Sequence, residues 1–140
     1  MDWRNEKCVM VIDQSLPLGI IANTAAILGV TLGRRLPEAV GGDVRDGGGR
    51  LHLGIIAFPI PILRADAGRL KALWETLSDP RYAGLTVADF TDFAQSCRTY
   101  AEYTAGLPSV PGTDLRCLGL AVCGEKKLVN KLTGRLPLLR

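Results

Sequence analysis

Acidic and hydroxyl side chains follow the apolar segments of this sequence at points where strands are expected to end. Asp13 comes directly after the apolar run Cys8–Ile12, and Asp89, Thr91 and Asp92 close a second such segment. Carboxylates and hydroxyls of this kind can act as general acids, general bases or ligand-binding groups. Because ligands of α/β sheets favour the crevice beyond the carboxyl ends of the strands, we predict a small-molecule site there.

Polar residues of the adjoining helices extend this predicted ligand-binding site. Asn23 and Thr24 lie near the start of an expected apolar helix, and Gln95, Ser96 and Cys97 lie early on another. An unpaired buried polar group costs about 1–3 kcal/mol, so a buried Asn or Thr needs a hydrogen-bond partner. Two interpretations of Asn23 and Thr24 therefore stay open. Either they bond the backbone or nearby aspartates as structural residues, or they face a polar pocket.

The cysteines and the single histidine do not form a metal-ligand pattern. Cys8, Cys97, Cys117 and Cys123 show no metal-like spacing, and His52 alone cannot hold a metal ion. Three of the cysteines lie within apolar runs, and no convincing export signal is present. We therefore expect free thiols, a cytoplasmic location, no metal and no cofactor. A thiol–imidazole pair of Cys97 with His52 is possible in principle, but nothing in the sequence brings the two together.

Composition predicts a single α/β domain spanning residues 1–140. The chain is 47% hydrophobic, 22% charged and only 6% aromatic, which is typical of an aliphatic, well-packed core. The net charge of +3 is compatible with nucleic-acid contact but does not predict it. The absence of GxGxxG and Walker sequences argues against dinucleotide-binding and P-loop enzymes.

Two further segments have a composition that a functional role could explain, one as a membrane helix and one as a patch that faces phosphate. The uncharged stretch Leu16–Gly33 contains a proline, three glycines and several polar residues, so we expect a buried helix and no membrane association. The C-terminal segment is rich in Lys and Arg, including Lys131. It is interpreted either as a solvated helix face or as a patch that faces phosphate.

The elements that must position the site alternate along the chain. Strands are predicted at Cys8–Ile12, Leu51–Ala57, Leu85–Thr91 and Leu115–Cys123, and helices at Leu18–Leu32, Asp66–Leu77, Phe93–Gly106 and Gly124–Gly134. Gly41–Arg50 is expected to be a surface turn, and the prolines of Phe58–Ile62 to mark an edge or an irregular crossing. This β-α-β-α-β-α-β-α order predicts a three-layer α/β/α sandwich. Its mixed sheet has about four strands, with helices on both faces.

Three sets of residues resemble a known family. They are Lys7–Asp13 followed by Leu16–Ala26, then Asp89–Asp92 with Ala94–Cys97, and finally Leu118–Val122 with Asn130–Gly134 and Leu136–Leu139. Together they resemble the uncharacterised bacterial family known as domain of unknown function two-thousand, over essentially the whole chain. That family in turn is similar to the type 2 peptidyl-tRNA hydrolases. This similarity implies a mixed four-stranded sheet between helices, often in a dimer, with tRNA as a partner.

The hydrolase resemblance fails where the catalytic lysine is expected. That lysine aligns best with Ile20, the glutamine position with Thr24, and a following helix histidine falls near Ile27. Losing one charged or donor group of this kind can cost about 3 kcal/mol of transition-state stabilisation. The resemblance places a site aspartate near the end of the third strand, so Asp92 is the predicted catalytic residue, with Asp89 as the other match. Asp92 is equally well placed to cap the next helix.

Three functions remain as predictions, and the sequence alone does not establish which is correct. The first is a small-molecule or nucleotide-type binding protein, and the second is a peptidyl-tRNA or other ester hydrolase that uses a relocated lysine such as Lys131 or Lys7. The third is an interaction module that forms a homodimer through the apolar segment Phe58–Leu63.

Overall fold

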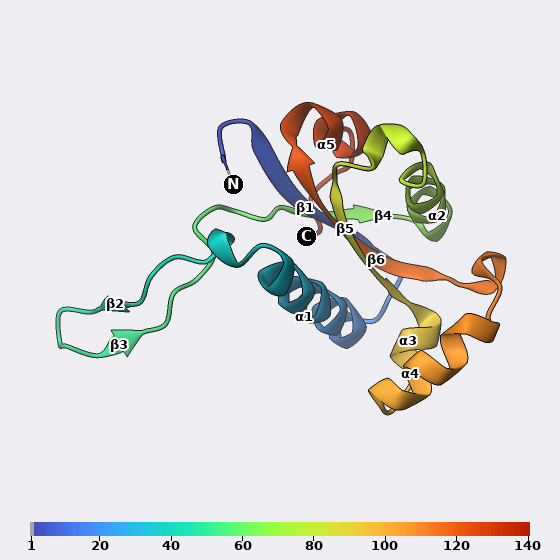
Figure 1. The fold of residues 1–140 in the computed structure, drawn as a ribbon, viewed down its shortest axis with the longest axis horizontal. Coiled ribbons are helices and arrows are strands. Elements are labelled where there is room, and N and C mark those ends of the chain that lie inside the picture. The colour runs from blue at the N-terminus through green and yellow to red at the C-terminus, as the bar shows by residue number, and fades with distance from the viewer. Residues whose placement is uncertain (1) are drawn as a thin grey trace.

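The computed structural model describes residues 2–140, and its centre is a four-stranded mixed sheet (Figure 1). The strands are β1 (Glu6–Asp13), β4 (Ile62–Ala65), β5 (Thr86–Thr91) and β6 (Cys117–Glu125), in the order β4-β1-β6-β5. β1 pairs parallel with β4, whereas β6 runs antiparallel to both β1 and β5. The predicted α/β class and mixed sheet are confirmed.

Helices cover both faces of this sheet. They are α1 (Leu18–Arg35), α2 (Ala67–Thr76), α3 (Asp92–Ser96), α4 (Tyr100–Gly106) and α5 (Lys126–Thr133). Single 3-10 turns occur at η1 (Pro37–Ala39), η2 (Pro80–Tyr82), η3 (Leu107–Ser109) and η4 (Gly112–Asp114). α1 packs on one face through Leu28 and Leu32. α2 and α5 pack on the other through Leu70 and Val129, which gives the expected three layers.

The two central strands are apolar throughout because both of their faces are covered. Every residue from Cys8 to Ile12 and from Cys117 to Cys123 is buried. α1 approaches β6 closely at Gly119, where an added Cβ would lie 2.6 Å from the methyl group of Thr24. This glycine therefore sets the spacing between the helix and the sheet.

The prediction that Leu51–Ala57 forms a strand of the central sheet is wrong. Instead β2 (Val44–Arg45) and β3 (Leu51–His52) form a separate two-stranded hairpin that projects from the body (Figure 1). The second strand of the central sheet is β4, which starts directly after Pro61. The apolar alternation of Leu51, Leu53 and Ile55 resembles that of a half-buried strand, but these side chains are exposed.

The predicted helix Phe93–Gly106 is two helices. α3 ends at Ser96, and the backbone of Cys97 is extended (φ −74°, ψ 137°). Thr99 then caps α4, because its hydroxyl accepts the N–H of Glu102 at 3.1 Å. A threonine that caps a new helix competes with continuation of the old one, and the sequence pattern alone did not show this break.

The outer edge of β4 is covered by the C-terminal segment. Arg64 N–H donates to Pro137 O and Leu139 N–H donates to Ile62 O, both at 2.9 Å, and Leu63 pairs with Leu138. Phe58 and Ile60 pack against the core on the α1 side. The apolar segment proposed above for dimer contact is therefore largely occupied by contacts within the chain.

Two of the four cysteines form a disulfide, which corrects the expectation of four free thiols. Cys8 on β1 and Cys123 on β6 are paired residues of adjacent strands and are bonded, with a Cα–Cα distance of 4.1 Å. Cys97 and Cys117 remain free. Disulfides are rare in reducing compartments, so this bond opposes the expected cytoplasmic location, which stays a prediction.

Within residues 2–140, no helix combines the length and the apolar character that crossing a bilayer requires. α1 is the longest helix at 18 residues, and it ends in Arg34 and Arg35.

Candidate ligand-binding cleft

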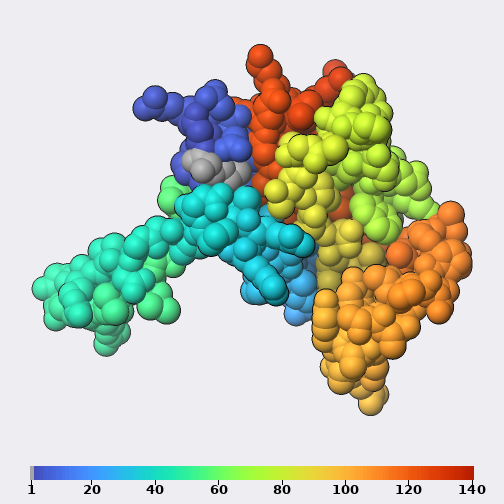
Figure 2. Space-filling view, in the orientation of Figure 1, coloured from blue at the N-terminus to red at the C-terminus, as the bar shows by residue number. Residues whose placement is uncertain are grey.

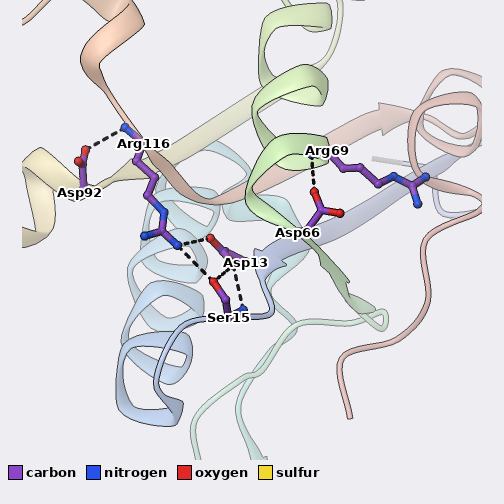
Figure 3. A network of polar contacts seen from close by, with 6 residues as sticks. All are labelled: Asp13, Ser15, Asp66, Arg69, Asp92 and Arg116. Atoms are coloured by element: carbon purple, nitrogen blue, oxygen red, sulfur yellow. Dashed lines mark hydrogen bonds and ion pairs between the residues drawn. The ribbon is translucent and has the colours of Figure 1, made fainter.

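The topology brings three chain segments to one end of the sheet. β1 and β5 both run antiparallel to β6, so their carboxyl ends meet the start of β6. Asp13 therefore lies near Arg116 (Figure 3), and in the strand register Thr91 pairs with Cys117. This is the strand-end position at which the sequence analysis placed its polar residues.

The Asp13 side chain is fully buried, and two neighbouring residues, Ser15 and Arg116, donate hydrogen bonds to its carboxylate. The backbone N–H and the hydroxyl of Ser15 donate to Asp13 Oδ1 at 2.9 and 2.6 Å, and Arg116 Nη2 donates to Asp13 Oδ2 at 2.6 Å (Figure 3). Burial by itself raises the pKa of the Asp13 carboxyl, but the hydrogen bonds from Ser15 and Arg116 outweigh it. The net pKa is lowered. Asp13 is thus an ionised structural anchor whose carboxylate oxygens are already occupied.

Asp92, the predicted catalytic residue, hydrogen-bonds to the backbone of Arg116. Its carboxylate accepts the backbone N–H of Arg116 at 3.0 Å and that of Phe93 at 2.9 Å, and its own N–H donates to Arg116 O. The N-cap of α3 is Thr91, whose hydroxyl accepts the N–H of Ala94 at 3.3 Å. Asp92 therefore holds the start of β6 against the start of α3 (Figure 3), and Thr91 caps that helix.

Next to this network, a cleft opens between α1, the outer edge of β5 and the α3–α4 segment. Its volume is about 580 Å³, within the range of small-molecule sites. In Figure 2 it lies at the notch between the cyan end of α1 and the orange α3–α4 helices. Three elements contribute its polar lining, which is Thr31, Arg35, Asp89, Cys97, Arg98, Thr99, Tyr100 and Tyr103.

The cleft carries unpaired positive charge. Ion pairs within residues 2–140 involve Arg81, Arg116 and His52, and none involves Arg35, Arg98 or the adjoining Arg34. Arg34 and Arg35 lie in the last turn of α1, where the helix dipole favours cations. The cleft therefore offers guanidinium groups to an anionic ligand.

Two tyrosines form an aromatic surface beside these arginines. The rings of Tyr100 and Tyr103 are 5.6 Å apart between centroids, and Tyr100 is 77% exposed. Burial, and then the negative charge of Asp89, raise the pKa of the Tyr103 hydroxyl. The hydroxyl stays protonated at neutral pH and can donate a hydrogen bond to a ligand.

Asp89 is the acidic residue of the cleft. The residue is exposed, and its side chain leaves β5 on the α2 side of the sheet, because its neighbours Ala88 and Phe90 pack toward α1. Even so, burial by the surrounding protein raises its pKa above the ordinary value of 3.8, and the indole N–H of Trp74 partly opposes the rise. The raised pKa of Asp89 therefore reflects its packing beside α2.

Replacing Asp89 with Asn is expected to raise the unfolding midpoint at neutral pH. A carboxyl whose folded pKa is raised destabilises the fold above that pKa, and the penalty disappears as the pH falls toward 3.8. Thermal melts of wild type and Asp89→Asn between pH 3.5 and about 8 measure the difference. A variant that is less stable than wild type at neutral pH would show that Asp89 is structurally required.

The free thiols differ in reactivity. Cys97 is partly exposed at the end of α3 and lines the cleft. Cys117 is buried, and burial together with the charges of Asp89 and Asp13 raises the pKa of its thiol to about 12. Cys117 therefore stays protonated and unreactive. His52 lies on the projecting hairpin, bonded to Asp46, so it does not meet Cys97.

The predicted site residues on the helices either make hydrogen bonds within their own helix or lie exposed on the surface. The Thr24 hydroxyl donates to Ile20 O at 2.7 Å, which is the structural alternative for this buried threonine. Asn23 and Gln95 are exposed, and the Ser96 hydroxyl donates to Phe93 O at 2.7 Å. Asp89 and Cys97 are the predicted residues that line the cleft.

The two candidate relocated lysines lie at the other end of the sheet. Lys7 is the second residue of β1 and donates to Asn130 of α5 at 2.9 Å, and Lys131 follows Asn130 and lies near Asp79. Asp13 lies six positions after Lys7 on β1, which is about 20 Å at the usual rise per residue. Neither lysine is placed to act together with Asp89 or Asp92.

Sequence reasoning missed the arginines and the tyrosines. Arg116 stands directly before the apolar run of β6, and a charge at that position was a usable signal for a strand-end residue. Tyr100 and Tyr103 lie three residues apart on α4. Their spacing gave no signal for a binding site, because one continuous helix was expected there and the break after α3 was not foreseen. Arg35, in the last turn of α1, was not among the predicted site residues.

Comparisons with known proteins agree with the fold. A solved protein of unknown function from Agrobacterium tumefaciens strain C58 has a TM-score of 0.85 and 18% sequence identity, covering 96% of this chain and 97% of that one. No curated protein matches the chain. The resemblance to the type 2 peptidyl-tRNA hydrolases stays a prediction. The model of the family described as "Protein of unknown function (DUF2000)" matches residues 6–140, so the chain belongs to this family.

Proposed function

We propose that this protein binds a nucleotide-type ligand, an aromatic base carrying phosphate, in the cleft between α1, β5 and α3–α4. The observation that carries the proposal is the meeting of unpaired arginines with the exposed Tyr100 and the partly buried Tyr103 in one cleft. Guanidinium groups match the geometry of phosphate oxygens, and tyrosine rings stack on bases. The two kinds of group are complementary to the two ends of such a ligand.

The arrangement assigns roles to the residues of α1 and α3–α4 that line the cleft. Arg35 and Arg98 contact the phosphate, and Tyr100 stacks on the base, because it is the more exposed ring. Arg116 and Asp92 do not contact the ligand in this proposal, but hold α3 and β6 so that the cleft keeps its shape.

The polar network at the strand ends supports binding in preference to hydrolysis. The carboxylates of Asp13 and Asp92 already accept hydrogen bonds from Ser15, Arg116 and Phe93, which leaves neither as an unengaged base. The lysines that a hydrolase would need lie at the opposite end of the sheet. We therefore rank the hydrolase second.

Isothermal titration calorimetry with three probes tests the proposal. A nucleoside measures the stacking contribution, inorganic phosphate the arginine contribution, and a nucleoside monophosphate both together. We expect the monophosphate to bind more tightly than either part. Tyr100→Ala is expected to cost about 1–3 kcal/mol with nucleoside and monophosphate, the value of one stacked base. Arg35→Ala is expected to weaken only the two phosphate-bearing probes.

Arg69→Ala is the matched control, because Arg69 is an exposed arginine on α2, away from the cleft. It should leave all three affinities unchanged. If no probe bound to the folded protein, or if Arg69→Ala weakened binding as much as Arg35→Ala, the cleft would not be a nucleotide site. Binding of tRNA but of no mononucleotide would favour the hydrolase-like alternative.

A further inference from the structure

A hairpin arm, residues 41–55, projects from the body of the protein (Figures 1 and 2), whereas Val40 and Ile56 at its root line a pocket together with Gly29 and Leu32 of α1. Every residue from Gly41 to Leu53 is exposed. Within it, β2 and β3 pair through only two residues each. An isolated two-stranded hairpin is marginally stable in water, so an arm of this kind needs a supporting surface.

The arm is nevertheless ordered by specific hydrogen bonds. At its tip, the Asp46 carboxylate accepts the N–H groups of Gly48 and Arg50 and contacts the ring of His52 at 2.9 Å. At its base, Gly41 N–H donates to Ile55 O at 2.9 Å. Gly54 lies so close to Gly41 O that no side chain fits there. These contacts fix the direction in which the arm extends.

The stem of the arm exposes large aliphatic side chains. Leu53 is 75% and Ile55 80% exposed, and Val44 and Leu51 are also exposed. Leu51, Leu53 and Ile55 are two residues apart, so in the extended chain they share one side. An apolar surface of this length on a projecting element is typical of a protein contact.

The same chain carries an apolar surface with no partner of its own. An apolar stripe on the outward side of α1 is formed by Leu18, Ala22, Ala26 and Val30, spaced by four residues and all exposed, with Asn23 and Thr31 exposed beside it; Val30 is 77% exposed. No charged residue occurs between Leu18 and Gly33. A surface helix normally turns charged residues toward solvent, so this face is expected to be covered by protein.

We propose that the arm of one copy packs its aliphatic side on the outward face of α1 of a second copy, and receives the partner's arm in return. In a twofold dimer such an exchange covers both apolar surfaces of both chains at once. The arm contributes Leu51, Leu53 and Ile55, and the α1 face contributes Leu18 and Val30, as the large apolar side chains at the centre of this interface. No other protein is needed to cover either surface.

The charges of the arm fit a second copy better than a membrane. Asp43 and Asp46 balance Arg45 and Arg50, so two copies do not repel each other through their arms. A segment that binds an anionic lipid surface is instead enriched in Lys and Arg without acids.

Sedimentation velocity of the full chain over a range of concentrations tests this proposal. Wild type is expected to sediment as a dimer of the 15.0 kDa chain. Because each change occurs twice in a symmetric dimer, Leu53→Asp with Ile55→Asp in the arm should raise the dimer dissociation constant by roughly a hundredfold or more. Val30→Asp on α1 should act similarly. Ser109→Asp, an exposed position on η3, is the control of equal charge and should remain a dimer.

Mixing the arm variant with the Val30→Asp variant distinguishes reciprocal exchange from arm–arm contact. The mixture keeps one intact contact, the unchanged arm of the Val30→Asp chain on the unchanged α1 of the other. It should therefore associate more tightly than either variant does alone. Circular dichroism checks that each variant is folded. A wild type that stays monomeric at about 100 μM, a range in which specific interfaces associate, would overturn the proposal. So would a Val30→Asp variant that dimerises like wild type.

Discussion

The Cys8→Ala/Cys123→Ala double variant is expected to lose about 4–5 kcal/mol of unfolding free energy relative to the oxidised wild type. The disulfide joins residues 115 positions apart, so it closes most of the chain into one loop. In the chain-entropy model, a cross-link of this span removes a large part of the conformational freedom of the unfolded state. Domains of this size are stable by roughly 5–15 kcal/mol, so a loss of that magnitude is a large fraction of the total.

Urea unfolding with and without a reductant measures this loss. The wild type should unfold at a lower urea concentration when reduced, whereas the double variant should not respond to the reductant. Cys97→Ala keeps the bonded pair and serves as the control. The reductant must be present during unfolding, because both bonded cysteines are buried in the folded state. Equal midpoints for oxidised and reduced wild type, with four thiols titrated in the unfolded protein, would show that the bond does not form.

Arg116→Met is expected to destabilise the protein by about 2–3 kcal/mol at neutral pH. Removing one partner of a buried ion pair leaves the other charge uncompensated. Arg116 is 48% exposed, so water can partly replace it, and the effect should fall below that of a fully buried pair. Asp13 would keep only its Ser15 contacts, so the pKa of its carboxyl would rise relative to the wild type, because the hydrogen bond and the charge of Arg116 would no longer lower it.

The pH dependence of this loss has a definite sign. The pKa of Asp13 in the wild type is lowered, so its contribution is fully present above the unfolded value of 3.8 and is lost as the pH falls through the folded pKa. The difference between wild type and Arg116→Met should therefore be largest near pH 7 and shrink toward and below pH 3.8. Urea unfolding at a series of pH values measures it.

Arg64→Met is the matched control for Arg116. Arg64 is an exposed arginine on β4 whose side chain makes one long hydrogen bond, to Gln14 at 3.4 Å. Its replacement should change stability by less than about 0.5 kcal/mol, as is usual for surface positions. An Arg116→Met variant as stable as Arg64→Met at every pH would show that the ion pair with Asp13 contributes nothing.

The sequence by itself determined the elements that are built from local patterns. The apolar runs around Val9 and Leu120 predicted β1 and β6, because a strand covered on both faces must be apolar along its length. Pro17 and the uncharged segment after it predicted α1, and Asp66 predicted the start of α2, which it caps. The helix break after Ser96 was missed, because Thr99 suits a helix interior poorly but does not by itself show that a new helix begins.

Only the tertiary structure decided which residues meet. Asp13 and Arg116 are 103 positions apart, and their pairing depends on the antiparallel register of β1 and β6. The cleft combines Arg35, Asp89 and Tyr100 from three separate elements. Long-range register and the order of strands in a sheet are not encoded in any local period of apolar residues. For the same reason the exposed alternation of Leu51, Leu53 and Ile55 was interpreted as a sheet strand. A local pattern shows that one side of a segment is apolar, but not which surface covers it.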